Sequence, residues 1–417
     1  MTLLAAVLSD YQRDWLDLLV RWLHVIAAIG WIGSSFYFVL LDQSLRTPKD
    51  PQDVADGVRG ELWEVHGGGF YHVKKYQVAP PELPEHLAWF KWEAYTTWLS
   101  GFALFVGLYW LDARTYMIDP TVADLGPWAA VGISAGLLVG AWVFYDVLCR
   151  LLRGRERLLI ALLVAGIALA AWGTGELFSP RAAWLQTGAM IGTIMAGSVF
   201  FNIIPAHWEL IRAKEAGRDP DPAPGIEAKR RSVHNNYFTL PVLVTMIAGH
   251  FPFMTTHSHA WLLLLCLMAL GAFTRHFYNL RHGGKTHWWM PAAAVAFVVL
   301  LMVLLRPDDA PDTSAAARGT SKPAPATTDA DADSQDAQMN AIGKSIFSTV
   351  GCAACHALAD AEATGSVGPN LDAAQPDEDL VRERVTNGQG GMPSFRGKLS
   401  ADEIDAVAQY VSGAAGR

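Results

Sequence analysis

A short stretch near the C-terminus has the residue types and spacing to hold an iron porphyrin. Cys352-Ala353-Ala354-Cys355-His356 places two thiols directly before an imidazole. In a Cys-x-x-Cys-His signature both thiols bond covalently to a c-type haem, and the histidine binds the iron from one side. A redox-active Cys-x-x-Cys or a chance match is the alternative. The motif predicts Cys352 and Cys355 as haem attachment sites and His356 as an axial ligand.

The residues that follow favour the haem over the alternatives. Gly391-Met392-Pro393-Ser394-Phe395 offers a methionine thioether for the opposite face of the iron, and residues 367–371 supply the loop between the two ligands. Together these pieces resemble a single-haem class I cytochrome c. The resemblance implies one covalent haem c, with Met392 as the second axial ligand, and a protein that transfers electrons.

The rest of the chain differs sharply from this region in composition. Of 417 residues, 52% are hydrophobic and 16 are Trp, and the first three hundred contain long stretches that are nearly free of charge. A membrane part followed by a soluble part explains this division. We predict an integral membrane domain over 1–306, a linker over 307–338 and a cytochrome c domain over 339–417. The net charge of −8 gives no support for a nucleic-acid partner.

Eight apolar segments are long enough, or nearly so, to cross a bilayer as helices of about 20 residues each. They are residues 18–41, 87–110, 127–149, 157–178, 185–205, 236–254, 259–281 and 287–305. The predicted fold is therefore all-α: an eight-span transmembrane helix bundle joined to a small class I cytochrome c domain.

The distribution of positive charge predicts an orientation. Lys and Arg gather after the first, third, fifth and seventh segments, and the alternate connections hold little beyond Arg114 and Arg181. The positive-inside rule then places both termini outside. Covalent haem attachment in bacteria belongs to the periplasmic side, which gives the same answer independently. We predict a multi-pass protein of the bacterial inner membrane whose termini and cytochrome domain are periplasmic.

The tract that joins the two predicted domains is rich in Ala, Asp, Thr, Pro and Ser. It contains too little apolar surface to fold and is predicted to be disordered. In the haem domain, 342–350 is predicted as the first helix and 401–412 as the last. Ser400 and Glu403 form the sequence pattern of a capping box for the last helix.

Two histidines inside the apolar segments are candidates for a second cofactor. His24 lies in the first span and His250 near the outer end of the sixth, at comparable predicted depth. Ionisable residues in a span are costly and mark functional sites, and two facing imidazoles are what a six-coordinate b-type haem needs. Two separately hydrogen-bonded histidines are the alternative. The pair predicts a haem b.

A second polar group lies at the opposite, cytoplasmic ends of the spans. It contains Lys91, Glu93, Asn202, His234, Asn235, Asn236, Arg275, His276 and Asn279. A few convergent polar groups among aromatic side chains are typical of a small-molecule site. The alternative is a solvated rim of positively charged loops.

These segments resemble a known family. The stretches 66–71, 90–101, 234–237 and 275–282, followed by the cytochrome motif, are similar to the bacterial membrane-bound urate hydroxylases. These are urate oxidases with an eight-span N-terminal domain and a C-terminal cytochrome. The resemblance implies oxidation of urate to 5-hydroxyisourate in purine degradation, with electrons passed to the respiratory chain rather than to dioxygen.

Urate chemistry assigns roles to the polar group. Urate is a planar anion with carbonyl and N–H groups, so it needs amides and a cation, and Arg suits a planar bidentate contact. The candidates for binding urate are Asn235, Asn236, Asn279, Arg275 and Lys91. Hydroxylation by water needs a general base, for which the candidates are His234, His276 and Glu93.

The expected partners are urate, the lipid bilayer and an electron acceptor such as a terminal oxidase or a soluble cytochrome. Electrons from a cytoplasmic site must cross most of a hydrocarbon layer about 30 Å thick, and a haem b at His24 and His250 would carry them part of the way. A non-catalytic conduit from quinol or haem b to the cytochrome is the main alternative. A transporter or sensor with an appended cytochrome is another.

Overall fold

The computed structural model describes residues 10–119, 122–255, 257–305 and 332–416, the last range with gaps at 366–367, 389–391, 393–394 and 397–398. The predicted disordered linker falls mainly outside the described residues. Its last part is described and is helical, because α13 (Ala332–Thr349) begins inside the predicted linker.

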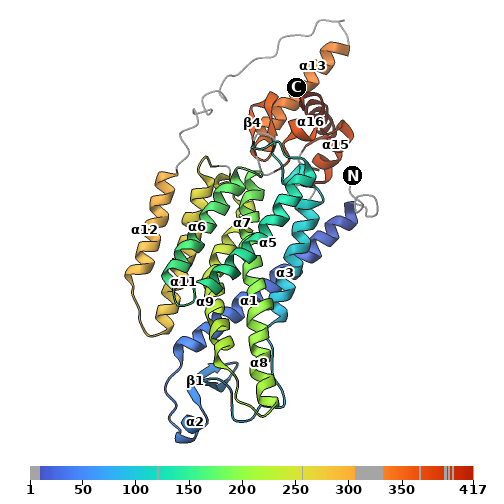
Figure 1. The fold of residues 1–417 in the computed structure, drawn as a ribbon. Coiled ribbons are helices and arrows are strands. Elements are labelled where there is room, and N and C mark those ends of the chain that lie inside the picture. Colours follow the sequence, from blue (N-terminus) through green and yellow to red (C-terminus); the bar gives the residue numbers. More distant parts are fainter. Residues whose placement is uncertain are drawn as a thin grey trace.

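Long helices lie side by side in the N-terminal part (Figure 1). They are α1 (Asp10–Ser44), α3 (Trp92–Phe105), α5 (Pro127–Leu151), α6 (Glu156–Gly175), α7 (Pro180–Ser198), α8 (Ile204–Glu215), α9 (Pro222–Ile247), α11 (Ala260–His282) and α12 (Trp289–Leu304). Short pieces complete them: α2 (Pro51–Ala55), η1 (Val106–Trp110), α4 (Ala113–Tyr116), η2 (Val199–Ile203), η3 (Ala248–His250) and α10 (Pro252–Thr255).

Local sequence explains where several helices start. Proline is the first residue of α5, α7 and α9, where its missing N–H costs no hydrogen bond. The Asp221 side chain caps α9 by accepting a hydrogen bond from the backbone N–H of Ala223 at 2.9 Å. The π-helical turn η2 joins α7 to α8, so Pro180–Glu215 is one continuous rod of 36 residues.

Small residues let the helices approach closely. A Cβ at Gly188 of α7 would lie 1.8 Å from Thr245 Oγ1 of α9, and one at Gly197 would lie 2.1 Å from the Trp142 indole of α5. No side chain fits at either position without displacing the neighbour. Close approach through small residues is a common way to pack helices in membranes.

Among the described residues, five helices are long and apolar enough to cross a membrane: Trp15–Ser44, Pro127–Leu151, Glu156–Gly175, Pro180–Glu215 and Ala260–His282. The other three predicted spans correspond to helices that do not meet this standard. α3 has 14 residues before a π-helical turn, α12 has 16 residues, and α9 is polar in its first half. The chain is a membrane protein, and its crossing eight times remains a prediction.

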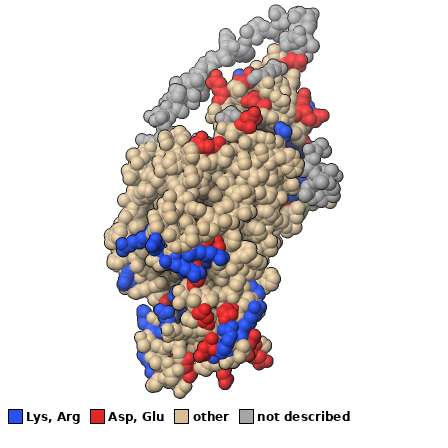
Figure 2. All heavy atoms as spheres, viewed as in Figure 1, with Lys and Arg blue, Asp and Glu red and all other residues tan. Residues whose placement is uncertain are grey.

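The outer surface of the bundle is apolar. Ile29, Val139, Leu169 and Met302 are each more than 60% exposed. Figure 2 shows a broad band without charge between the charged C-terminal domain and a cluster of Lys and Arg side chains further along the bundle. Such a surface is costly in water and suits the hydrocarbon layer of a bilayer.

The first long connection contains a β-hairpin, which the all-α prediction missed. Strands β1 (Val58–His66) and β2 (Gly69–Tyr76) pair antiparallel, and the turn between them is Gly67-Gly68 with φ of 58° and 82°. A two-residue turn with both φ values positive is typical of tight hairpins and favours glycine. The hairpin and α2 lie at the end of the bundle opposite the C-terminal domain (Figure 1).

The C-terminal domain is a small helical fold around one core. Its elements are α13, η5 (Cys352–Ala354), β3 (Ala357–Leu358), η6 (Ala359–Ala361), β4 (Ala363–Thr364), α14 (Leu371–Ala374), α15 (Glu378–Asn387) and α16 (Ala401–Ala414). Phe347 and Tyr410 meet edge to face with centroids 6.1 Å apart. Ser400 and Glu403 form the predicted capping box.

Candidate functional site

The Cys-x-x-Cys-His motif folds into a turn that suits a covalent haem. Cys352 and Cys355 are free and partly buried, at the end of α13. His356 Nδ1 donates a hydrogen bond of 2.9 Å to the carbonyl oxygen of Pro369. This bond fixes the imidazole tautomer and leaves Nε2 for the iron. Burial lowers the pKa of His356, which keeps the ring in the neutral, ligating form.

Two further observations fit a haem here. A Cβ at Gly368 would lie 2.4 Å from His356 Cε1, so only glycine leaves room for the ring in this position. Met392 and Cys352 pack against the same hydrophobic core, which places the predicted second ligand in the same small domain. Cys352, Cys355, His356 and Met392 are therefore the residues that would hold the haem, which accepts one electron at a time when bound.

In the membrane domain, three of the predicted binding residues come together. The Oδ1 atom of Asn236 accepts hydrogen bonds from Arg275 Nε at 3.1 Å and from Asn279 Nδ2 at 3.0 Å. The Arg275 guanidinium lies over the Phe36 ring, 3.8 Å from its centroid. Asn236 is 1% exposed and Arg275 3% exposed. Helices α9 and α11 thus hold a buried cation against an aromatic side chain of α1.

Several atoms of this cluster lack a partner within the described part of the chain. They are Arg275 Nη2, Asn236 Nδ2, Asn279 Oδ1 and His282 Nδ1, all of them buried. A buried polar atom without a hydrogen bond costs about 1–3 kcal/mol. Arg275 Nη2 and Asn236 Nδ2 are hydrogen-bond donors, Asn279 Oδ1 is an acceptor, and the imidazole nitrogen of His282 can do either. Such a mixture suits a ligand that carries both carbonyl and N–H groups.

Two cavities flank the cluster. One of ≈160 Å³ is lined by Val39, Gln43, Val233, Asn236, Tyr237, His276, Asn279 and Leu280. The other, of ≈450 Å³, is lined by Phe36, Tyr37, Leu40, Leu240, Arg275, Tyr278 and His282. Small-molecule sites usually measure about 300–1,000 Å³, so the second cavity has the size for a ligand and the first is small. His276 borders the small cavity, and its Nδ1 shares a 2.7 Å hydrogen bond with the Tyr237 hydroxyl.

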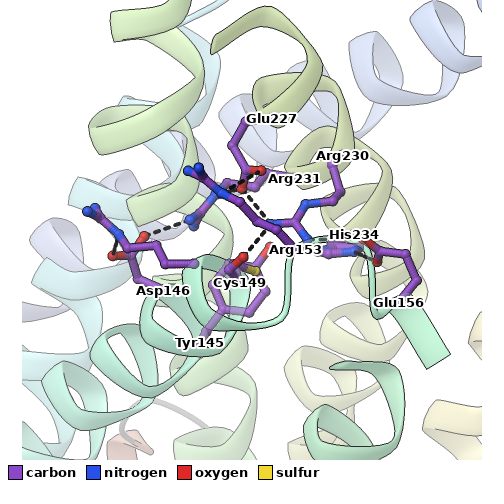
Figure 3. Close-up of polar contacts among 10 residues, drawn as sticks. Tyr145, Asp146, Cys149, Arg153, Glu156, Glu227, Arg230, Arg231 and His234 are labelled. Atoms are coloured by element: carbon purple, nitrogen blue, oxygen red, sulfur yellow. Dashed lines mark hydrogen bonds and ion pairs between the residues drawn. The ribbon is translucent and has the colours of Figure 1, made fainter. Parts of the chain in front are cut away.

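His234 belongs to a different group of side chains (Figure 3). Its Nδ1 shares a hydrogen bond of 2.9 Å with the Tyr145 hydroxyl of α5, and its Nε2 lies 3.7 Å from the Glu156 carboxylate. Arg231, only 1% exposed, pairs with Asp146 at 2.8 Å and with Glu227 at 3.1 Å. This network joins α5, α6 and α9 and does not include the Asn236 cluster.

The sequence analysis missed this network, although one signal for it was present. Asp146 lies inside the third apolar segment, where an ionisable residue marks a site of interest. Arg230 and Arg231 look like ordinary loop cations in the sequence. Arg230 instead donates to the Cys149 carbonyl at 2.6 Å and to the Glu227 carboxylate at 2.7 Å.

Three further predicted residues lie apart from the Asn236 cluster. Lys91 sits among indoles, 4.8 Å from the Trp89 ring centroid. Glu93 packs against Gly30 between α3 and α1, and its buried Oε2 has no partner among the described residues. Asn235 donates to the Met195 carbonyl oxygen of α7 at 3.0 Å.

The two histidines predicted to bind a second haem have different surroundings. His24 Nδ1 donates to the Thr97 carbonyl oxygen at 3.0 Å, and a Cβ at Gly101 would lie 2.7 Å from His24 Cε1. His356 is positioned in the same way, by a hydrogen bond from Nδ1 to a carbonyl oxygen and by a glycine beside the ring. His250 is exposed in η3, which packs against α7, α9 and α10. His24 thus has the oriented imidazole that a haem ligand needs, whereas the predicted partner His250 is an exposed side chain.

Comparison with known proteins decides the family. The family described as "Urate oxidase N-terminal" matches residues 10–306, and "Cytochrome C oxidase, cbb3-type, subunit III" matches residues 338–411. The chain belongs to the urate oxidase N-terminal family. The resemblance to membrane urate hydroxylases with a cytochrome c domain is confirmed.

The C-terminal part is similar to several c-type cytochromes. Cytochrome c6 of Leptolyngbya boryana is 37% identical over 75 residues, covering 17% of this chain and 87% of that protein. Cytochrome c6 of Microcystis aeruginosa is 40% identical over 79 residues, 16% of this chain and 89% of that protein. The c-type cytochrome SorU from Sinorhizobium meliloti is 50% identical, covers 19% of this chain and 95% of its own, and has a TM-score of 0.19.

Family and cytochrome relatives together establish the class of protein. This urate oxidase family member is an oxidoreductase of urate-related redox chemistry with a haem c. Its bundle contains helices long and apolar enough to span a membrane, and its cytochrome-like C-terminal domain serves electron transfer.

Proposed function

We propose that the protein oxidises urate to 5-hydroxyisourate and passes the electrons through haem c to the respiratory chain. The observation that carries the proposal is the Asn236–Arg275–Asn279 cluster, with its unpartnered buried atoms beside a cavity of ≈450 Å³. Urate has the complementary groups: a negative charge, carbonyl oxygens and ring N–H groups. Membership of the urate oxidase N-terminal family supports this substrate.

The proposed binding mode assigns one task to each group. Asn236 Oδ1 and the Phe36 ring hold the Arg275 guanidinium in place. Its Nη2 atom donates a hydrogen bond to a carbonyl oxygen of urate, and its positive charge attracts the urate anion. Asn236 and Asn279 line the adjoining cavity of ≈160 Å³ rather than the larger one, so their task is to hold Arg275 in place. A planar cation held by both an amide and an aromatic ring is pre-organised, so little entropy is lost on binding.

The overall reaction is urate + H₂O → 5-hydroxyisourate + 2 e⁻ + 2 H⁺. The oxygen of water bonds to C5 of urate, and two electrons leave the ring. When bound, haem c would take the electrons singly, and a terminal oxidase or a soluble cytochrome is the proposed acceptor. We place the cytochrome domain in the periplasm and the urate site toward the cytoplasm.

A haem b bound through His24 is part of the proposal. It would shorten the transfer across a hydrocarbon layer of about 30 Å. The hydrogen bond from His24 Nδ1 to the Thr97 carbonyl oxygen leaves Nε2 free for iron, which supports this assignment. A pyridine haemochrome spectrum of the purified protein should contain both b-type and c-type bands, and the b-type band should vanish in His24→Ala. Haem c alone in the unaltered protein would remove haem b from the proposal.

Anaerobic reduction of the haem tests the function itself. Purified oxidised protein mixed with urate should show reduced haem c and form 5-hydroxyisourate, at one urate consumed per two electrons. The product is measured by its absorbance and by its decay. Reduction by quinol with none by urate contradicts the proposal and favours a redox conduit.

A further inference from the structure

The proposed hydroxylation needs a group that takes a proton from water, and several histidines lie at this end of the bundle. His234 shares its Nδ1 with Tyr145 and faces Glu156 with Nε2, in the network apart from the urate cluster. His276 lines the small cavity, and its Nδ1 is bonded to Tyr237. His72 Nε2 is paired with Glu61 at 2.7 Å. None of these three lines the larger cavity.

His282 does line it. The cavity of ≈450 Å³ has His282 and Arg275 in its wall, both from α11. The Nδ1 atom of His282 is buried and has no hydrogen-bond partner among the residues that the structure describes. The His282 side chain thus borders a space of ligand size, and its Nδ1 atom has no protein partner among the described residues that would compete with a ligand.

The spacing on α11 supports a joint role for the two side chains. Arg275 and His282 are seven residues apart, which is two helical turns, so they share one face and are separated by about 10 Å along the axis. A bicyclic ring placed between them contacts both. The end of α11 is held against α1, because Ser44 Oγ donates to the His282 carbonyl oxygen at 3.4 Å.

We infer that His282 is the general base of the proposed reaction, and the inference rests on that function. As the water oxygen forms its bond to C5 of urate, Nδ1 of His282 takes a proton from the water. The urate ring loses two electrons, which would leave one at a time through the haem groups of the proposed function. A ring N–H of urate releases the second proton to solvent. Charge and atoms then balance with the overall equation.

The test combines a substitution with chemical rescue. His282→Asn keeps a polar group near the Nδ1 position but removes the base. Positioned general bases contribute about 10²–10⁴-fold. We therefore expect urate-dependent haem reduction to slow by at least about 10²-fold, while urate binding to pre-reduced protein, measured by calorimetry, changes little. In His282→Ala, added imidazole should restore part of the rate, since it enters the space that the side chain leaves.

The matched control is His66→Asn, an exposed histidine at the hairpin turn, which should leave both rate and binding unchanged. Wild-type protein that urate does not reduce contradicts the proposed function as a whole. Wild-type reduction with an unchanged rate in His282→Asn overturns the inference alone. Loss of binding in step with rate, without rescue by imidazole, overturns it in favour of a binding role.

Discussion

The proposed haem c site and the proposed urate site around Arg275 would hold their ligands in opposite ways. The haem residues Cys352, Cys355 and His356 lie within five positions, and the Pro369 carbonyl already accepts the hydrogen bond that orients His356. The Arg275 site is assembled from α1, α9 and α11, and leaves buried polar atoms unpartnered. A covalent cofactor needs a local motif, whereas a dissociable ligand needs a cavity with polar groups that no protein atom already satisfies.

Removing the covalent attachment should separate the two sites most strongly. In the double variant Cys352→Ala and Cys355→Ala, we expect no covalently bound haem in denaturing gels stained for haem and no urate-dependent electron transfer to an external acceptor. Urate binding should persist, because distant sites act independently to within about 0.5 kcal/mol. Continued urate oxidation in this variant would show that the electrons leave by another route.

The network around Arg231 provides a structural contrast to both sites. Arg231→Met removes the most buried cation beside Asp146 and Glu227, which keep only the more exposed Arg150 and Arg230 as partners. Breaking a buried ion pair costs up to about 3–5 kcal/mol. We expect a large fall in thermal stability in detergent, with the remaining folded protein still reduced by urate.

Arg153→Met is the matched control for the same partner. Arg153 is 69% exposed and lies 4.0 Å from Glu227, and an exposed pair contributes about 0–1 kcal/mol. Equal losses from the two substitutions would mean that burial does not govern this network.

Substitution in the cavity should weaken urate binding and leave the haem intact. Arg275→Lys keeps the charge but loses the planar fork that bonds Asn236 Oδ1 and faces Phe36. Loss of a charged hydrogen bond costs about 1.5–3 kcal/mol, so we expect the Kd for urate to rise roughly 10- to 150-fold. Calorimetry with pre-reduced protein measures this.

Arg281→Lys, an exposed cation on the same helix, is the control and should bind urate normally. If it weakens binding as much as Arg275→Lys does, the loss cannot be assigned to the guanidinium that Asn236 and Phe36 hold.

Helix period and charge in the sequence predict much of the membrane part. They place polar residues at the right ends of the helices, and the amides and cation of Asn236, Asn279 and Arg275 do come together. Helix period and charge do not show which neighbouring helix each of two adjacent residues contacts. Asn235 and Asn236 are adjacent, yet one bonds α7 and the other α11, because successive helical positions point about 100° apart. The same ambiguity leaves His282 out of the predicted site.

Two other differences have physical causes. The all-α prediction contains no hairpin, although two glycines between β-prone runs predict a tight turn. The ion-pair network was overlooked because Arg231 lies beside Lys229 and Arg230 in a run of positive charge. Only the tertiary structure shows that Arg231 is buried.

The smallest predicted effect concerns the last helix of the haem domain. The backbone N–H and hydroxyl of Ser400 bond the Glu403 carboxylate and lower its pKa. The contribution of the Glu403 carboxylate to stability is therefore present at neutral pH and is lost as the pH falls through the lowered pKa of the folded state.

Ser400→Ala should cost about 1 kcal/mol. The loss should be seen as a lower temperature at which the Met392–iron absorption band disappears in the full-length protein. Glu403→Gln should destabilise at neutral pH and match wild type in acid. Ser348→Ala, an exposed serine within α13 that bonds the Lys344 carbonyl oxygen, is the control. A destabilisation by Glu403→Gln that is the same at both pH values would assign the effect to packing rather than to the charge.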